Sequence, residues 1–418
     1  MNSHPRTAYL LIPAAAAALL LAPGTPAAAA SARGMAMGDA YIGLAAGVDA
    51  ARYNPANLGL DGHRRSEVEI AGLGLNLTNN AFTLGDYNAY TGAFLTDDDK
   101  ADLLSKVPPQ GLALTADVQA SAVSFAQGSF AFSTSGVGQA GVQLSRDLLE
   151  LVLNGNTFGD SVSITGSYSD AVAYAAAGIS YGRALYTAGS RQFAVGGTLK
   201  YLRGLAVEQV VELEGLAAAF ATGLEGEGRL VARTASGGSG FALDLGAALK
   251  ISDAYTAGLQ VRNLVSRLSW SGTPEEHRYI FSFDTVTVDN MDDDFVVAES
   301  GTRSLDPFTT TLPAVLTAGF ARTSGKLLWA IDWQQGFRRA AGASTKPRLG
   351  LGLESRHLRF LPLRAGFAAG GEQPTAFSFG SGVAAGPLFF DAAVMTGTDL
   401  SPYSAKGLNA ALSIGLHL

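Results

Sequence analysis

The stretch "LNAALSIGLHL", residues 408–418, decides the fold class, because large apolar side chains recur at every second position. Leu408, Leu412 and Leu416 fall on one face, and Asn409 and Ser413 fall on the other. Strict alternation of this kind predicts a β-strand. Segments of about nine to fourteen residues with the same alternation recur along the chain, separated by Gly, Asp, Asn, Ser or Pro; residues 191–203 and 205–215 are two of them. They predict an all-β protein of about fourteen to sixteen strands.

The composition favours a curved sheet over packed helices. The chain of 418 residues contains 51 glycines, no cysteine and only 16% charged residues. Glycine weakens a helix by about 1 kcal/mol per position, whereas it suits turns and bends in strands. Without cysteine, disulfides cannot stabilise the fold. The formal net charge of −7 argues against nucleic acid as a partner, because nucleic-acid binding depends on clustered lysine and arginine.

Residues 1–30 have the pattern of a secretory signal peptide. Arg6 precedes an apolar core over residues 8–22, and the small-residue run "PAAAASA" predicts cleavage near Ala30 or Ala32. The core is shorter than the roughly 20 residues that a membrane-spanning helix needs, and no later stretch is apolar throughout about 18 residues. An exported chain built of strands indicates a place in the bacterial outer membrane.

Alternation alone does not tell whether the apolar face points into a core or out into lipid. A soluble barrel of so many strands would enclose more space than its side chains can fill, whereas membrane barrels of that size tolerate a wet or plugged lumen. A closed sheet also pairs every backbone polar group, as a bilayer requires. Trp329 and Trp333, about 13 Å apart on one strand face, fit an interfacial aromatic belt. We therefore predict a closed antiparallel transmembrane β-barrel of about 14 strands, with apolar side chains facing lipid.

Two short helices interrupt the strands. In "LTDDDKADLLSKVPP", Thr96 or Asp97 can cap a helix; in "SRDLLELVLNGN", Ser145 caps a helix that Gly155 ends. Both are too short to be stable alone, so we expect them to cover a loop or the mouth of the barrel. The acidic stretch at residues 288–300, with "GTRSLDPFTTT" after it, predicts one long loop. No change of composition marks a second domain.

Residues 31–62, "SARGMAMGDAYIGLAAGVDAARYNPANLGLDG", resemble the region after the signal peptide in the FadL-like outer-membrane transporter superfamily. That superfamily includes long-chain fatty-acid transporters and PorV-type barrels. The residues that carry the resemblance are Gly38, Ala40, Ala46, Asp49, Asn54, Pro55 and Ala56. The resemblance implies a fourteen-stranded barrel over residues 63–418 and a plug, residues 31–62, folded into its lumen. Its plug-motif residues are Gly38, Asp49, Asn54, Pro55 and Ala56.

The residues themselves are compatible with a plug. Small residues such as Gly34, Ala36 and Gly43 let a short chain pack closely inside a tube, and Pro55 fixes a turn. Asn54 can satisfy buried backbone groups through local hydrogen bonds, as Asn does in turns. An N-terminal coil with an ordinary Asn-Pro turn is the alternative interpretation.

No catalytic, cofactor or metal site is predicted, and we do not expect an enzyme. "GVGQAG" at residues 136–141 matches a dinucleotide-binding glycine pattern, but the chain lacks a repeated βαβ unit. The five histidines are scattered, and Ser413 and His417 on one strand face are ordinary groups for a wet lumen. The acidic groups at 97–99 and 292–294 lack calcium-loop spacing and are expected to be solvated. The family's ligand-contacting positions have no matching motif here, so the ligand-binding residues stay unknown.

The barrel and the resemblance together predict passive uptake of hydrophobic small molecules, such as long-chain fatty acids, across the outer membrane of a Gram-negative bacterium. Loops and helices around 85–106 and 145–155 would catch the ligand, which passes into a greasy lumen pocket and leaves when the plug around Asn54 moves or through a gap in the wall. The expected partners are outer-membrane lipid, lipopolysaccharide and the hydrophobic ligand. A PorV-like scaffold that anchors or hands over secreted proteins is the alternative. A continuous apolar cavity would favour transport, and a fully blocked lumen would favour the scaffold.

Overall fold

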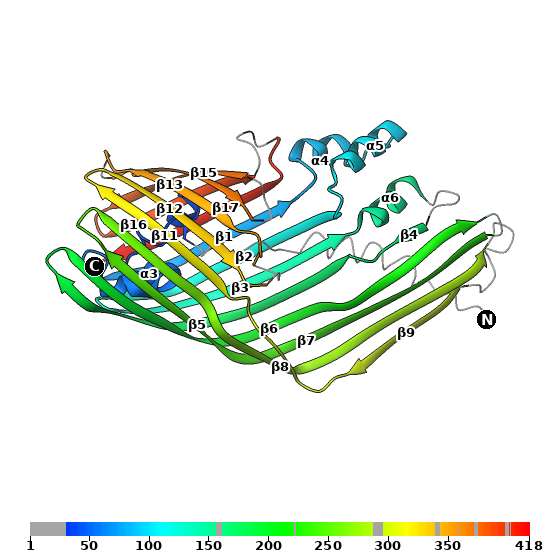
Figure 1. Ribbon diagram of the computed structural model, residues 1–418, viewed down its shortest axis with the longest axis horizontal. Coiled ribbons are helices and arrows are strands. Elements are labelled where there is room, and N and C mark those ends of the chain that lie inside the picture. The colour runs from blue at the N-terminus through cyan, green and yellow to red at the C-terminus, as the bar shows by residue number, and fades with distance from the viewer. Residues whose placement is uncertain are drawn as a thin grey trace.

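In the computed structural model, the chain forms one closed antiparallel β-barrel (Figure 1). The structure describes residues 31–155, 161–220, 223–286, 296–338, 343–358, 360–371, 375–397, 401 and 403–418. The predicted signal peptide, residues 1–30, lies outside them. The strands are β1 (Glu67–Asn79), β2 (Leu112–Gln127), β3 (Phe130–Leu144), β4 (Ser161–Ser163), β5 (Tyr168–Ala188), β6 (Arg191–Phe220), β7 (Gly223–Lys250), β8 (Tyr255–Val286), β9 (Val296–Ser304), β10 (Phe308–Thr310), β11 (Val315–Ser324), β12 (Leu327–Gly336), β13 (Arg348–Ser355), β14 (Leu363–Gly370), β15 (Thr375–Ala385), β16 (Leu388–Gly397) and β17 (Gly407–His417).

Fourteen of these strands form the wall, as predicted. The ring closes at β1, where Leu73 pairs with Ala120 of β2 on one side and with Leu412 of β17 on the other. The short strands β4, β9 and β10 add to the edges of β6 and β8. Because the wall is closed, its strands have no free edge, which a bilayer would not tolerate.

The apolar face of the wall points outward. Leu408 and Leu412 of β17 are 56% and 45% exposed, whereas Ala411 and Ser413, the two chain neighbours of Leu412, are buried on the inner face. The same alternation runs along β13, where the exposed leucines are Leu349, Leu351 and Leu353. Outward apolar side chains with small or polar residues inside are the arrangement of a membrane barrel, so the predicted orientation is confirmed.

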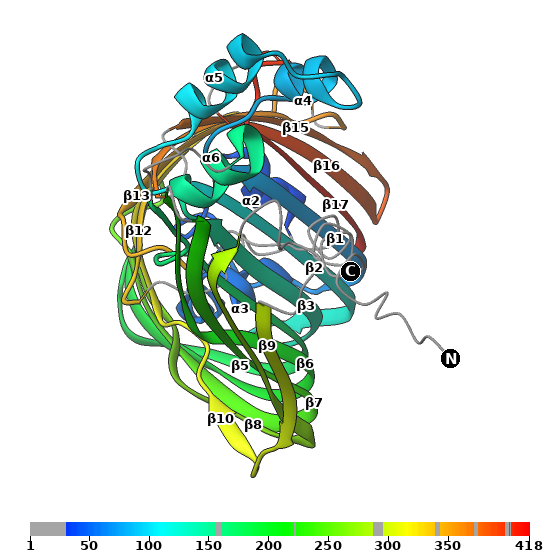
Figure 2. The same cartoon turned by 90° about the vertical axis from the view of Figure 1, so that its right-hand side faces the viewer.

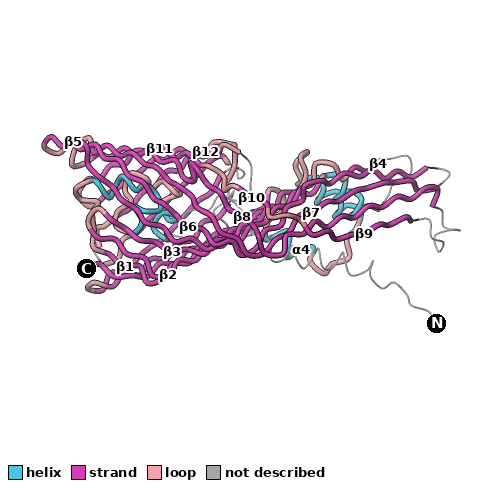
Figure 3. The backbone as a smooth tube through the Cα atoms, turned by 90° about the horizontal axis from the view of Figure 1, so that it is seen from below, coloured by secondary structure: helices cyan, strands magenta, loops and turns pink. Residues whose placement is uncertain are grey.

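Three strands extend far beyond the wall. β6, β7 and β8 contain 30, 28 and 32 residues, whereas about 9–11 residues cross a membrane. With β4 and β9 they project past the rim as a sheet (Figure 3), which we call the β-arm.

The length of these strands corrects two expectations. Separate strands ending near 203 and starting near 205 were expected, but Gly204 is not a turn: a Cβ there would lie 2.6 Å from the Trp270 ring, so this glycine makes room for the indole. Of the long loop expected from 288 to 311, residues 288–295, with the acidic group 292–294, lie outside the described residues. From Val296 onward the expectation is wrong, because β9 and β10 pair with β8. The glycines of residues 136–141 lie within β3, so they belong to a wall strand.

The two ends of the barrel differ. At the end that carries the β-arm lie α4 (Leu84–Tyr90), α5 (Asp97–Lys106) and α6 (Arg146–Asn154) (Figure 1). Thr96 caps α5 and Ser145 caps α6, as predicted, whereas α4 was not expected. We call this the long-loop end. At the opposite, short-turn end, tight turns join β2 to β3 and β5 to β6, and the C-terminus lies there.

Among the described residues, no helix is both long enough and apolar enough to cross a membrane.

Candidate functional site: the N-terminal segment and the lumen

Residues 31–62, the N-terminal segment, lie inside the ring of strands near the short-turn end (Figure 2). The segment contains α2 (Ala32–Ala36), α3 (Val48–Tyr53) and the 3-10 helix η1 (Pro55–Gly59). Helices this short have no stability of their own in water, so contacts with the wall must hold them. Ala36, Ile42 and Leu58 have no exposed surface.

Inward-facing glycines of the wall make this close packing possible. A Cβ at Gly196 would lie 2.4 Å from the carbonyl carbon of Pro55, and one at Gly366 would lie 2.2 Å from the amide nitrogen of Gly38. Real Cβ atoms do not approach backbone so closely, so only glycine lets the two backbones meet. The glycines that contact the segment, which we call the seat glycines, are Gly182, Gly196, Gly246, Gly258, Gly319, Gly350, Gly352, Gly366 and Gly380.

An aspartate interrupts the seat glycines and binds the segment. Asp332 of β12 pairs in register with Gly319 on one side and Gly350 on the other. Its carboxylate accepts hydrogen bonds from the amides of Tyr41 (2.7 Å) and Ile42 (2.8 Å). A buried carboxylate therefore satisfies two backbone donors that the irregular segment leaves unpaired.

Ion pairs also join the segment to the wall. They are Arg33–Glu354 (2.7 Å), Asp39–Arg348 (2.7 Å) and Arg52–Glu69. Removing one partner of such a buried pair leaves an uncompensated charge and costs about 3–5 kcal/mol. The pairs therefore fix one orientation of the segment within the barrel.

The five plug-motif residues all lie in the segment, but the structure does not gather them into one cluster. Gly38 adopts a φ of +66°, and its amide donates to the Ser378 hydroxyl of β15 (3.0 Å). Asn54 caps η1 by accepting from the Ala56 amide (3.1 Å), and its own amide group donates to the Ala247 carbonyl of β7 (2.9 Å). Pro55 is the first residue of η1. These residues are therefore separate anchor points around the ring.

Asp49, the remaining motif residue, lies in an acidic environment. Ser31 donates a hydrogen bond to its carboxylate (3.0 Å), and Arg52 lies 3.6 Å away. Burial raises the pKa of Asp49 to about 6; Arg52 opposes this rise, while Glu67 and Glu69 add to it. Asp49 is thus a carboxylate that changes charge close to neutral pH.

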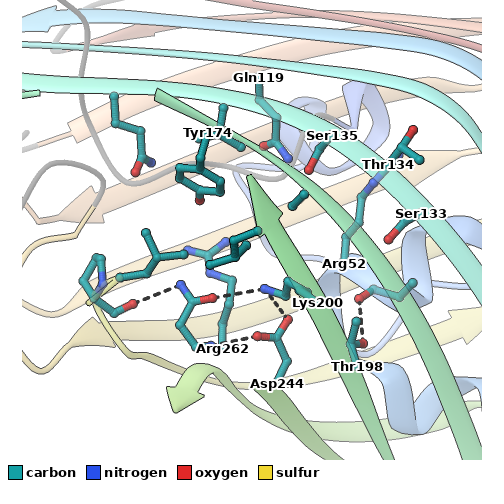
Figure 4. Close-up of a pocket in the computed structure, with 18 residues that line it drawn as sticks. Arg52, Gln119, Ser133, Thr134, Ser135, Tyr174, Thr198, Lys200, Asp244 and Arg262 are labelled. Atoms are coloured by element: carbon teal, nitrogen blue, oxygen red, sulfur yellow. Dashed lines mark hydrogen bonds and ion pairs between the residues drawn. The ribbon is translucent and has the colours of Figure 1, made fainter. Parts of the chain in front are cut away.

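A cavity of about 90 Å³ lies next to the segment, and Figure 4 shows the side chains that line it. Ala51 and Arg52 of α3 bound it on the side of the segment. On one wall, the Lys200 ammonium contacts the carboxylate of Asp244 (2.7 Å) and the side-chain oxygen of Asn263 (3.1 Å). The charged group was not singled out from the sequence, although a lone lysine at an inward strand position between apolar residues is a signal that could have found it.

Part of the lining of this cavity is apolar and continues into a larger cluster. Tyr174, Ala176, Leu202 and Leu312 line the cavity and also pack in a buried group around Trp270. The whole cluster is Val172, Tyr174, Ala176, Leu202, Val207, Ala235, Ala242, Leu268, Trp270, Phe308 and Leu312. The greasy pocket expected from the sequence is therefore only partly apolar, because charged and polar side chains also line it.

In the described part of the chain, no group of three or more His, Cys, Asp or Glu side chains is placed to hold a metal ion. Ser413, considered above as a lumen group, accepts a hydrogen bond from the Ala32 amide (3.2 Å), so it holds the segment. His417 lies 3.5 Å from the Glu67 carboxylate.

Comparison with known proteins places this architecture. A family of unknown function (DUF5723) matches residues 63–215. No curated protein sequence matches the chain significantly. Among solved structures, the Ralstonia pickettii toluene transporter TbuX aligns with a TM-score of 0.51 at 14% identity, over 94% of this chain and 98% of that chain. A Pseudomonas aeruginosa FadL homologue aligns with a TM-score of 0.50 at 14% identity, over the same shares.

The Pseudomonas putida toluene transporter TodX aligns with a TM-score of 0.50 at 13% identity, over 95% of this chain and 98% of that chain. At such identities the likeness concerns the fold. The resemblance first seen in residues 31–62 is confirmed at that level: this chain has the fold of the FadL-like outer-membrane transporters.

Proposed function

We propose that the protein is an outer-membrane channel for the passive uptake of hydrophobic small molecules, with the N-terminal segment acting as its plug. The observation that carries the proposal is the cavity between the segment and the apolar cluster around Trp270, on the inner face of a wall whose inward residues are mostly small or polar. An apolar surface in a lumen suits an apolar ligand. The solved structures with the same fold include proteins described as toluene transporters.

The long-loop end offers a surface for capture. Outer-membrane barrels carry short periplasmic turns and longer extracellular loops, which puts this end outside the cell. Leu84 and Tyr87 of α4, Phe94 between α4 and α5, and Val152 of α6 are exposed there. Apolar groups clustered on such helices commonly mark binding surfaces. A ligand that enters the lumen down its own gradient needs no energy source.

The size of the cavity requires movement during passage. An apolar cavity of about 150 Å³ holds one benzene molecule, and this one has about 90 Å³. Ligand binding must therefore displace side chains or the plug. Within the hydrophobic class we propose long-chain fatty acids, because Lys200 and Arg262 stand beside the apolar wall and suit a molecule with a carboxylate and a long tail.

Trp270 makes the proposal testable. The chain has three tryptophans; Trp329 and Trp333 alternate with inward residues of β12 and so face outward. In a variant with both replaced by Phe, Trp270 is the only indole, and it is fully buried beside the cavity. Dibromostearate should quench its fluorescence saturably, whereas brominated phospholipid should not. Absence of saturable quenching, or equal quenching by the phospholipid, would contradict lumen binding.

One observation favours the second candidate, a PorV-like scaffold for secreted proteins. The β-arm projects past the long-loop end (Figure 3) and is much larger than loops that only guard a small-molecule channel need to be. Deleting residues 213–230, which pair across β6 and β7, would shorten the arm without touching the wall. If the deletion removes a secreted protein from the cell surface while dibromostearate quenching stays unchanged, the scaffold is supported. If the deletion variant displays the same secreted proteins as the parent, the scaffold is contradicted.

A further inference from the structure

A second cavity, of about 270 Å³, lies at the short-turn end between the N-terminal segment and the wall. It is separate from the cavity beside Trp270, and none of its residues lines both. Its lining combines charged and apolar side chains from the segment, from the chain that leads into β1, and from the β13–β17 side of the wall. The proposed passage of hydrophobic compounds makes no use of these charged groups.

Most charges in this cavity are already paired. Arg33, Arg356 and Arg364 all contact the buried carboxylate of Glu354, with Arg33 at 2.7 Å and Arg364 at 2.8 Å. Arg364 also contacts Asp391 at 2.5 Å. Three guanidinium groups therefore share two carboxylates, which leaves one positive charge in excess on this side of the cavity.

The acids on the other side of the cavity are engaged as well. Asp49 accepts from Ser31 and lies 3.6 Å from Arg52. Glu67 lies 3.5 Å from the imidazole of His417. Neither carboxylate forms an ion pair with the further arginine that lines the cavity.

Arg65 is that further arginine. It lines the cavity, and within the described part of the chain it has no hydrogen bond or ion pair. Burial lowers the pKa of Arg356, which lies just beyond the end of β13, and repulsion from Arg33 and Arg65 lowers it further. Arg356 is thus already paired with Glu354, whereas Arg65 faces the same cavity without an ion-pair partner among the described residues. An arginine fork is suited to bind a carboxylate through two hydrogen bonds.

The same cavity offers an apolar surface. The ring of Phe389 stacks on the imidazole of His417, with centroids 4.7 Å apart and planes at 24°. Tyr41 and Pro362 also line the space. The volume exceeds the roughly 150 Å³ that holds benzene, so a ring together with a carboxylate fits.

We propose that this cavity binds a small monocarboxylate with an apolar body, its carboxylate held by Arg65 and Arg356 and its body lying against Phe389. The site would hold an organic acid at the mouth that faces the periplasm. The inference does not rest on the proposed uptake of hydrophobic compounds, because it concerns a different cavity and an equilibrium binding measurement.

Calorimetric titration of the full-length mature protein in detergent tests the site with three probes. Benzoate has both the carboxylate and the ring, acetate has only the carboxylate, and benzyl alcohol has only the ring. Benzoate should bind at least about tenfold more tightly than either, because both halves of the cavity contribute. Equal binding of benzoate and acetate, or of benzoate and benzyl alcohol, would overturn the proposal.

Arg65→Gln should weaken benzoate binding about tenfold or more, the usual effect of losing a charge-assisted pair. Arg203→Gln is the matched control, because Arg203 is an exposed arginine of β6 outside the cavity. Unchanged benzoate affinity in Arg65→Gln, or an equal loss in both variants, would refute the site. Circular dichroism of each variant shows whether it has folded. Saturable dibromostearate quenching of Trp270 in each variant tests the proposed uptake separately from benzoate binding.

Discussion

The contact between the seat glycines and the N-terminal segment leads to a quantitative prediction. In Gly196→Ala, the new Cβ would lie 2.4 Å from the carbonyl carbon of Pro55 and 2.5 Å from the amide nitrogen of Ala56. Both are backbone atoms, so neither can rotate away. Overpacking of this kind costs about 1–3 kcal/mol. The clash is between wall and segment, so the segment relieves it by moving off, and its docking should weaken about 5- to 150-fold.

A matched control lies in a nearby strand. A Cβ at Gly136 of β3 would meet nothing within 4 Å. Gly136→Ala should therefore leave docking of the segment unchanged and raise stability by up to about 1 kcal/mol, because alanine restricts the unfolded chain.

The absence of cysteine provides the assay. Because the chain has none, Ala45→Cys introduces a single thiol in the segment, at a position with no exposed surface. The parent and both glycine variants all carry this thiol, so the effect of Ala45→Cys on docking is the same in each and cancels in the comparison. Maleimide should label it about 5 to 150 times faster in Gly196→Ala than in the parent, and at the parent rate in Gly136→Ala. Equal rates in the two glycine variants would refute the role assigned to the seat glycines.

Three further predictions follow from the contacts of the segment. Asp332→Ala leaves the amides of Tyr41 and Ile42 without an acceptor, so docking of the segment should weaken by about 2–6 kcal/mol. Maleimide should then label the Ala45→Cys thiol rapidly even at neutral pH. A labelling rate as slow as the parent's would contradict the role of these hydrogen bonds. The pKa of Asp49 is raised to about 6 in the docked segment, so the docked state binds the proton more tightly than the free segment does. Docking should therefore weaken by up to about 3 kcal/mol as the pH rises from about 4 to 6. Asp49→Asn should abolish that part of the pH dependence of the labelling rate. N-terminal sequencing of the exported protein should begin at Ser31, whose hydroxyl caps α2 and contacts Asp49, and a start two residues later would contradict this.

The sequence by itself determined the strands and their two faces. In β17, period-two alternation identified which residues share each face, and the burial pattern of the structure agrees from Leu408 to Leu416. Alternation reports local backbone geometry, which neighbouring residues encode. The same local logic found the caps Thr96 and Ser145, because a cap involves residues only three positions apart.

The tertiary structure decided what local patterns cannot express. Gly204 looked like a break between strands, whereas in the structure it accommodates Trp270, which lies 66 residues further along the chain. The strand β9 in the expected loop exists because it pairs with β8, and pairing partners leave little trace in a single strand.

The seat of the N-terminal segment is the clearest case. Its motif suggested a plug only through resemblance, and nothing near it in the sequence names the groups that hold it. Asp332 is separated from Tyr41 by 291 positions and Glu354 from Arg33 by 321. Barrel closure brings these inward residues to one level, so the seat and both cavities are properties of the closed ring, and the sequence of no single strand contains them.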